Sequence, residues 1–450
     1  MINFFKKYST QLTILLIGIL VLFSSLNVKW GGDRWHSLLR DDAKGYYAYL
    51  PAVFIYQDLS FSFYDTVENR HYRYPSLSYD YRYTYEGRRM NKYYSGTSLF
   101  QMPFFLMAHV LSKPLGYASD GYSKIYWISI GYAAIFYLLL GLWFLSKVLV
   151  LYEIPKPIIN LVLFIITMGT HLFYYTSFEP GMSHVYSFAL ISYFVLLSKK
   201  YFKEPNKWTI LQIAAIIGLI TLIRPVNALV VFLLPFLAGD MKTFTQSFQN
   251  LIKKQLLFFI IGLIIMIMIA GIQLVLYKIQ SGYFFIYSYG SQGFNFMDPH
   301  MIDILFSYRK GLFLYTPITF ISLFAAITFY KKDKYLIYTF AAFFLILTYI
   351  FASWSVWWYG GSYSSRVYVE FLPVFAILLA LLLMAIETKK WRNRIIVVLF
   401  FLVLFNQKQT YLYRIGYIHY QDMTKEKYWE SLVHPFNWWY YDIRNKVLTK

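Results

Sequence analysis

Residues 12–23 read LTILLIGILVLF, an uninterrupted apolar run behind the basic pair Lys6 and Lys7. Apolar runs of roughly 16 to 25 residues recur along most of the chain, and helices of about this length cross a bilayer. Of the 450 residues, 58% are hydrophobic and 14% are charged, whereas a soluble domain carries about a quarter charged residues. The sequence therefore predicts an all-α polytopic membrane protein.

The first apolar run is predicted to stay in the mature protein. Residues 24–27, Ser-Ser-Leu-Asn, lack the small-x-small pattern of a signal-peptide cleavage site. We interpret the run as an uncleaved signal anchor with its N-terminus in the cytoplasm.

The hydropathy pattern predicts about eleven spans, and the positive-inside rule orients them. The predicted spans are residues 10–28, 124–150, 157–173, 183–198, 208–222, 226–238, 256–278, 311–330, 335–353, 367–387 and 395–405. Residues 98–111 are predicted to lie at the interface or to be half inserted. With that assignment five basic clusters share the cytoplasmic side: Lys6/Lys7, Lys199/Lys200/Lys203/Lys207, Lys242/Lys253/Lys254, Lys331/Lys332/Lys334 and Lys389/Lys390/Arg392/Arg394.

This topology divides the chain into four parts. Residues 1–28 form the signal-anchor span, and residues 29–123 form an outer loop with an Asp-Asp pair, amphipathic helices and a short hairpin. Residues 124–405 form the transmembrane bundle, and residues 406–450 form a short outer tail with Trp438 and Trp439. The hairpin is expected because Tyr recurs at every second position from Tyr79 to Tyr85. Its aromatic face is predicted to lie at the lipid headgroups, with direct stacking on a sugar as the alternative.

Several function classes are excluded or disfavoured by composition. The formal net charge is +20 and there are no cysteines. Much of the positive charge lies in short loops, where it sets topology, so nucleic-acid binding is not indicated. Thiolate nucleophiles, disulfides and Cys-based metal sites are excluded. The chain has no GxxxxGK[ST], GxGxxG or HExxH sequence.

The outer loop opens with RDDAKGYYAYLP at residues 40–51, which places two carboxylates just outside the first span. Glycosyl transfer with inversion needs one base to take the proton of the acceptor hydroxyl. Asp41 or Asp42 is the candidate base. The alternative is structural, because an Asp at this place can cap the short helix that follows.

Four cations are candidates for binding a phosphate. Guanidinium groups bind phosphate oxygens in a bidentate fork and stabilise a departing phosphate. Arg224 lies beside Pro225 between two short apolar segments, where an ionisable residue indicates function. The other three lie near span ends, where the alternative is a side chain that reaches the lipid headgroups; they are Arg309, Lys310 and Arg366.

A metal site is not favoured by the sequence. Glu179 and His184 are five residues apart on a predicted outer turn, and two ligands are weak evidence for a bound ion. Asp298 and His300 are equally weak. We expect no cofactor, although a divalent cation is compatible with the Glu179 turn.

The order of these motifs resembles the GT-C fold glycosyltransferases, especially bacterial relatives of protein O-mannosyltransferases and of the lipid A aminoarabinose transferase. The resemblance lies in Asp41-Asp42 with Tyr46 and Tyr47, in residues 179–184 (EPGMSH), 224–227 (RPVN) and 309–312 (RKGL), and in residues 360–366 (GGSYSSR). It covers most of the chain, from residue 40 to about residue 370. In that family the paired motif tends to be Asp-Glu, so the resemblance leaves open which Asp matches.

The resemblance implies an inverting transfer of a hexosyl or pentosyl group from a polyprenyl-phosphate donor to a lipid, glycan or protein hydroxyl. The site would face the outside of a bacterial cytoplasmic (inner) membrane. Asp42 or Asp41 would be the base, and the donor phosphate would contact Arg309, Lys310, Arg366 and Arg224. The implied substrate contacts are Lys44, Tyr46, Tyr47, Glu179 and His184.

Three other functions fit a polytopic chain. A transporter or flippase of lipid-linked or envelope substrates explains the many spans and Arg224, but internal repeats are expected in transporters and none is visible. A surface-polysaccharide polymerase or ligase usually has its long loop late in the chain. A non-enzymatic assembly factor would not need the Asp pair.

Overall fold

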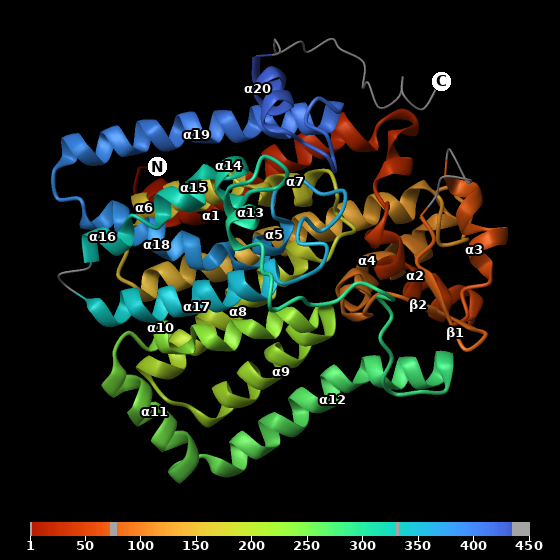
Figure 1. Cartoon of the computed structure of the whole chain (residues 1–450), viewed down its shortest axis with the longest axis horizontal. Helices are drawn as coiled ribbons and strands as arrows, with labels where there is room; N and C mark the ends of the chain where they lie inside the picture. Colours follow the sequence, from red (N-terminus) through yellow and green to blue (C-terminus); the bar gives the residue numbers. More distant parts are fainter. Residues whose placement is uncertain (1, 73–78, 330–332, 434–450) are drawn as a thin grey trace. The chain divides into compact units, whose positions relative to one another are not determined.

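The computed structural model describes residues 2–72, 79–329 and 333–433. The chain forms two compact units, each built from separate segments. Unit 1 contains Met1–Ile14, Ser146–Tyr174 and Ser291–Lys450; unit 2 contains Leu15–Leu145 and Tyr175–Gly290. The described residues are mostly helical, with a single two-stranded sheet among them (Figure 1).

Six helices are long and apolar enough to cross a membrane, or up to eight if each of two bent pairs is one span. The six are Tyr8–Trp30 (α1 and the π-helical turn after it), Lys124–Leu151 (α5), Leu256–Ser281 (α12), Lys334–Ala352 (α17), Arg366–Ala385 (η7 and α18) and Lys389–Ile415 (α19). The chain is thus a polytopic helical membrane protein, as predicted. The predicted count of about eleven spans stays a prediction.

Three predicted spans are broken or bent rather than continuous. Residues 157–173 become α6 (Lys156–Met168) and α7 (His171–Ser177), which are bent by 64°. Residues 311–330 become three short helices, α14 (Leu312–Tyr315), α15 (Pro317–Ser322) and α16 (Ala325–Phe329). Pro317 begins α15 because proline lacks the N–H that a continuous helix would need there. Residues 226–238 begin as a 3-10 helix, η6 (Pro225–Leu233), and end as α10 (Leu234–Ala238).

The helices of unit 2 pack through small residues. Its other long helices are α4 (Gly96–Ser112), α8 (His184–Lys203), α9 (Lys207–Ile223) and α11 (Met241–Lys254). α12 lies against α9, where a Cβ added at Gly262 would lie 3.0 Å from the Cβ of Ala214. Helices in a bilayer approach closely through such small residues. At 17 residues, α4 is about 25 Å long, shorter than a hydrocarbon core of about 30 Å.

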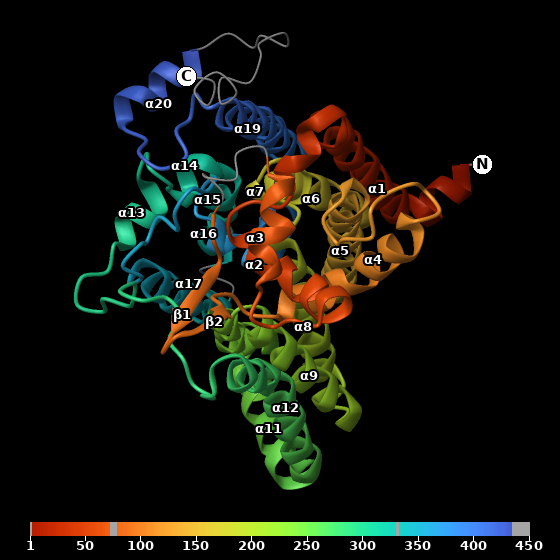
Figure 2. The ribbon, with the colours of Figure 1, turned by 90° about the vertical axis from the view of Figure 1, so that its right-hand side faces the viewer.

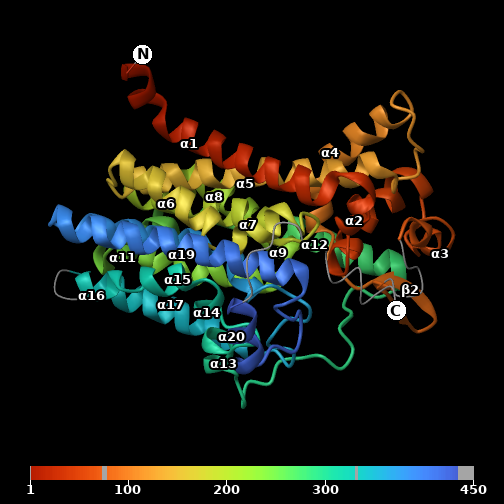
Figure 3. The same cartoon turned by 90° about the horizontal axis from the view of Figure 1, so that it is seen from above.

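Unit 1 is organised around α18 (Leu372–Ala385), which contacts α6, α15 and α16. In the span that contains α18, 94% of the most apolar stretch of 18 residues is buried inside the protein. A helix that is apolar on all sides is expected inside a bundle rather than at its edge. α19 lies along α6 and α15 on the same unit, and α20 (Lys425–Val433) follows it (Figure 3).

The predicted hairpin is confirmed, with shorter strands than the tyrosine pattern indicates. β1 (Arg82–Tyr85) pairs antiparallel with β2 (Arg88–Asn91) (Figure 2). In this register Tyr83 is opposite Met90. Glu86 and Gly87 between the strands both have positive φ, 45° and 78°, as a two-residue hairpin turn requires. Part of the predicted segment before it, residues 73–78, lies outside the described residues, as do Trp438 and Trp439.

Gly96 fixes the start of α4 against the end of α9. A Cβ at this position would lie 2.4 Å from the backbone nitrogen of Ile223 and from the carbonyl carbon of Leu222. We expect Gly96→Ala to destabilise the protein by about 1–3 kcal/mol, because backbone atoms cannot move aside as a flexible side chain can. A thermal unfolding curve in detergent measures this. Gly271→Ala is the control, since its added methyl meets nothing within 4 Å; equal melting temperatures would contradict the prediction.

Candidate functional site

Asp41 and Asp42 lie at the start of α2 (Asp42–Pro51), where the sequence predicts a cap or a catalytic base. Asp41 precedes the helix and makes no side-chain capping hydrogen bond. Its backbone has φ 50° and ψ −126°, a conformation that costs a non-glycine residue about 1–3 kcal/mol. The capping interpretation is therefore wrong for Asp41, which is exposed.

Asp42 is half-buried and is held by a tyrosine that the sequence analysis did not single out. The hydroxyl of Tyr93 donates to Asp42 Oδ1 at 2.6 Å, and it contacts the hydroxyl of Tyr79 at 2.8 Å. Burial raises the pKa of Tyr93, and the charge of Asp42 raises it further, so the phenol keeps its proton. The close approach of Tyr93 requires Gly45, where a Cβ would lie 2.2 Å from the tyrosine ring.

Arg224 ends α9 with an extended backbone, φ −154° and ψ 115°, directly before Pro225. Proline disfavours the helical conformation in the residue before it, which explains why the helix ends there. The side chain is half-buried. The prediction that Arg224 lies between two short helical segments is confirmed, because η6 begins at Pro225.

Tyr289, on the loop after α12, is within electrostatic range of both Asp42 and Arg224. Burial raises the pKa of Tyr289, and the nearby Tyr46 and Asp42 raise it further. The charge of Arg224 lowers the same pKa. Lys92 adds a second cation, with Nζ 5.0 Å from the centre of the Tyr289 ring. Charged groups from distant segments of unit 2 thus influence the same phenol.

Lys44, Tyr46 and Tyr47, predicted substrate contacts, are buried. Lys44 is 2% exposed, and its Nζ lies 3.4 Å from Glu68 Oε1 and donates to the hydroxyl of Tyr64 at 3.3 Å. Tyr47 donates to the carbonyl of Gly121. The described contacts of Lys44 and Tyr47 are internal to the protein, and their substrate role stays a prediction.

Glu68 is a second residue that the sequence analysis missed. Its Oε2 accepts hydrogen bonds from the hydroxyls of Tyr81 at 2.8 Å and Tyr122 at 2.9 Å, while Oε1 faces Lys44. One buried carboxylate therefore connects α2 to three other segments of the outer loop. No motif around residue 68 marks this role, because it depends on contacts between segments.

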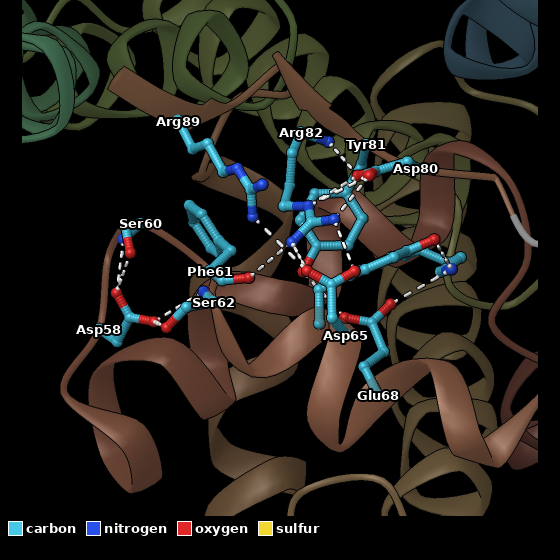
Figure 4. Close-up of polar contacts among 12 residues, drawn as sticks. Asp58, Ser60, Phe61, Ser62, Asp65, Glu68, Asp80, Tyr81, Arg82 and Arg89 are labelled. Atoms are coloured by element: carbon cyan, nitrogen blue, oxygen red, sulfur yellow. Dashed lines mark hydrogen bonds and ion pairs between the residues drawn. The ribbon is translucent and has the colours of Figure 1, made fainter. Parts of the chain in front are cut away.

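Arg82, at the start of β1, ties the hairpin to α3 (Phe63–Thr66). Its guanidinium lies between two carboxylates, with bonds of 2.8 and 2.9 Å to Asp65 and of 2.8 to 3.1 Å to Asp80 (Figure 4). Planar, bidentate pairs of this kind fix orientation. The hairpin is thereby held close to the segment that carries Glu68.

Glu179 and His184 lie on the turn before α8 and at its first residue. Glu179 is half-buried, and His184 is buried with its ring edge-on to Tyr175 at 4.6 Å between ring centres. Within the described ranges, no group of three or more acidic, His or Cys side chains is placed to hold a metal ion. A role for either residue in substrate binding stays a prediction.

The remaining predicted phosphate contacts belong to unit 1. Arg309 stacks on Trp358 at 3.7 Å and donates to the carbonyl of Gln421 at 2.8 Å and to Asp422 at 3.1 Å. Lys310 is buried and donates to two backbone carbonyls, those of Ser362 and Tyr420.

Arg366 is half-buried at the first residue of η7 (Arg366–Phe371). The residue before it, Ser365, donates to the carbonyl of Lys310 at 2.7 Å. The two segments RKGL and GGSYSSR, quoted separately from the sequence, are therefore adjacent in unit 1.

The fold and these clusters define a polytopic helical membrane protein with charged and tyrosine-rich groups at the ends of its spans and on the segments between them. No family model matches the chain, and no curated protein matches it. Among solved structures, it is similar to the archaeal oligosaccharyltransferase AglB from Archaeoglobus fulgidus in complex with an inhibitory peptide and a dolichol-phosphate. The identity is 11% and the TM-score is 0.46, over 97% of this chain and 62% of that chain. This chain thus spans less than two thirds of the length of AglB.

Proposed function

We propose that the protein is a membrane glycosyltransferase that moves a sugar from a polyprenyl-phosphate donor to a hydroxyl of a lipid, glycan or protein. The observation that supports this best is that a positioned carboxylate and a guanidinium belong to the same compact unit. Asp42 is held by the hydroxyl of Tyr93 at 2.6 Å, and Arg224 lies at the end of α9. A base for the acceptor and a cation for the leaving phosphate are the two groups that such a transfer needs.

In the proposed reaction Asp42 accepts the proton of the acceptor hydroxyl while that oxygen bonds to the anomeric carbon. The bond between the anomeric carbon and the phosphate oxygen breaks, and the polyprenyl phosphate leaves with the additional negative charge. Attack opposite the leaving phosphate inverts the anomeric carbon. Arg224 stabilises the charge on the phosphate.

Arg224 is proposed as the first contact of the leaving phosphate, because it belongs to the same compact unit as Asp42. Arg309, Lys310 and Arg366 are kept as secondary candidates. Arg309 faces a carboxylate and an aromatic ring, and the ammonium of Lys310 is bonded to carbonyls. The site is proposed to face the outside of a bacterial cytoplasmic membrane, with the N-terminus inside.

The test is sugar transfer in proteoliposomes that contain the purified protein and a membrane extract as acceptor. Labelled sugars are supplied on polyprenyl phosphate and, in parallel, on nucleotides. We expect transfer from a lipid-linked donor and none from a nucleotide. If no donor yields transfer but the protein moves the labelled lipid between leaflets, the transporter alternative replaces the proposal.

A further inference from the structure

The helix α11 (Met241–Lys254) has three distinct faces. The face formed by Thr243, Phe244, Ser247, Asn250 and Leu251 is buried or half-buried. It turns toward the protein, where the ring of Phe244 lies 6.4 Å from that of Phe202 on α8. The other two faces are exposed.

One exposed face is apolar. Met241, Phe248 and Ile252 are 59%, 58% and 40% exposed, and Thr245 lies between them. Their spacing of three, four and seven residues places them on one stripe of a helix. Water is a poor environment for such a stripe, since exposed apolar area costs about 25 cal/mol per Å².

The neighbouring exposed face is polar and basic. It is formed by Lys242, Gln246, Gln249 and Lys253, with Lys254 at the end of the helix. Asp240, which directly precedes α11, is occupied as its N-cap and accepts from the Thr243 nitrogen at 2.8 Å. The exposed surface of α11 is therefore apolar on one side and positively charged on the other.

The position of α11 places it where a span reaches the membrane surface. α12, one of the six long apolar helices, begins at Leu256 immediately after α11. Only 11% of its most apolar stretch of 18 residues is buried within the protein. On the other side, Gly239 has φ 89°, and the chain turns by 120° between η6–α10 and α11. A helix that is turned in this way beside a lipid-exposed span is suited to lie along the interface.

We propose that α11 is an interfacial helix that binds anionic phospholipids. Its apolar stripe enters the upper acyl region, and Lys242, Lys253 and Lys254 contact the headgroup phosphates. The charge is complementary to the anionic cytoplasmic leaflet, and the adjoining α12 supplies continuity with the bilayer. This inference does not rest on the proposed glycosyl transfer.

The absence of cysteine from the chain makes a site-specific test direct. The variant Phe248→Cys is labelled with a bimane fluorophore and placed in nanodiscs with equal fractions of phosphatidylglycerol and phosphatidylcholine. Two preparations are compared: in one the phosphatidylglycerol, and in the other the phosphatidylcholine, is brominated in the upper acyl chain. Quenching by the brominated anionic lipid is expected to exceed quenching by the brominated neutral lipid. An attraction of about 1 kcal/mol per lysine corresponds to a local enrichment of the anionic lipid by at most roughly fivefold for each lysine. Added salt should reduce this enrichment.

The control variants separate charge from burial in lipid. Lys242→Gln, Lys253→Gln and Lys254→Gln together should equalise the two quenching values, and Arg at all three positions should preserve the difference. A label at Gln249→Cys should be quenched less than one at residue 248, and a label at Ile267→Cys on α12 verifies insertion. Equal quenching by both lipids in the parent protein, or no quenching at residue 248, would overturn the proposal.

Discussion

Asp42→Asn is expected to lower the rate of sugar transfer by about 10²- to 10⁴-fold, the usual contribution of a general base. An amide oxygen can still accept the hydrogen bond from Tyr93, so the variant should keep the geometry of α2. What it loses is the ability to take the proton of the acceptor hydroxyl. The initial rate of transfer from a labelled polyprenyl-phosphate donor measures the effect.

Asp41→Asn is the matched control, because it removes a charge one residue away. Asp41 is exposed and makes no capping hydrogen bond, and we expect its replacement to change the rate by only a few-fold. The opposite pattern would make Asp41 the base. Undiminished transfer in the double variant, with an unchanged melting temperature, would eliminate the carboxylate mechanism altogether.

Much of the helical framework follows from local sequence. Apolar runs of sufficient length predict α5, α12 and α17 closely, because the cost of exposing backbone polar groups to lipid leaves few alternatives to a helix. The hairpin follows from alternating tyrosines and from Glu86-Gly87, which accepts positive φ. These signals lie within single segments, so they can be recognised from the sequence alone.

The site is harder to predict, because its key contacts join distant segments. Asp42 and Arg224 are visible in the sequence as unusual charges, but Tyr93 and Tyr289 are only two of 45 tyrosines. Nothing local distinguishes a tyrosine that holds a carboxylate from one at the lipid headgroups. Lys44 lies beside the Asp pair in the sequence, but the contact of its ammonium with the buried Glu68 is visible only in the structure.

Glu68→Gln is expected to destabilise the protein by about 3–5 kcal/mol, the usual cost of removing one partner of a buried ion pair. The pair is 1% exposed at both side chains, and the variant leaves the charge of Lys44 facing a neutral amide. Chemical unfolding of unit 2, followed by bimane at a single introduced cysteine in the outer loop, measures the loss. A change below about 1 kcal/mol, typical of an exposed pair, would contradict the buried pairing.

The double variant Lys44→Met/Glu68→Gln should recover much of the stability, because it removes both charges and so leaves no buried charge without its partner. The Gln side chain retains an oxygen that can accept from the hydroxyls of Tyr81 and Tyr122. A double-mutant cycle therefore separates the ion pair from the tyrosine contacts. If the two single effects simply add, Lys44 and Glu68 are not coupled.

Lys44→Met alone gives a pH-dependent result. Burial raises the pKa of Glu68, and the charge of Lys44 opposes that rise, so removing the lysine should raise the pKa further. A carboxyl group with a higher pKa in the folded state binds more protons there than in the unfolded chain. The free energy of unfolding then decreases as pH rises from the unfolded to the folded pKa. We expect Lys44→Met to be nearest to wild-type stability below the ordinary pKa of Glu and to lose stability toward neutral pH, which unfolding curves across that pH range will detect.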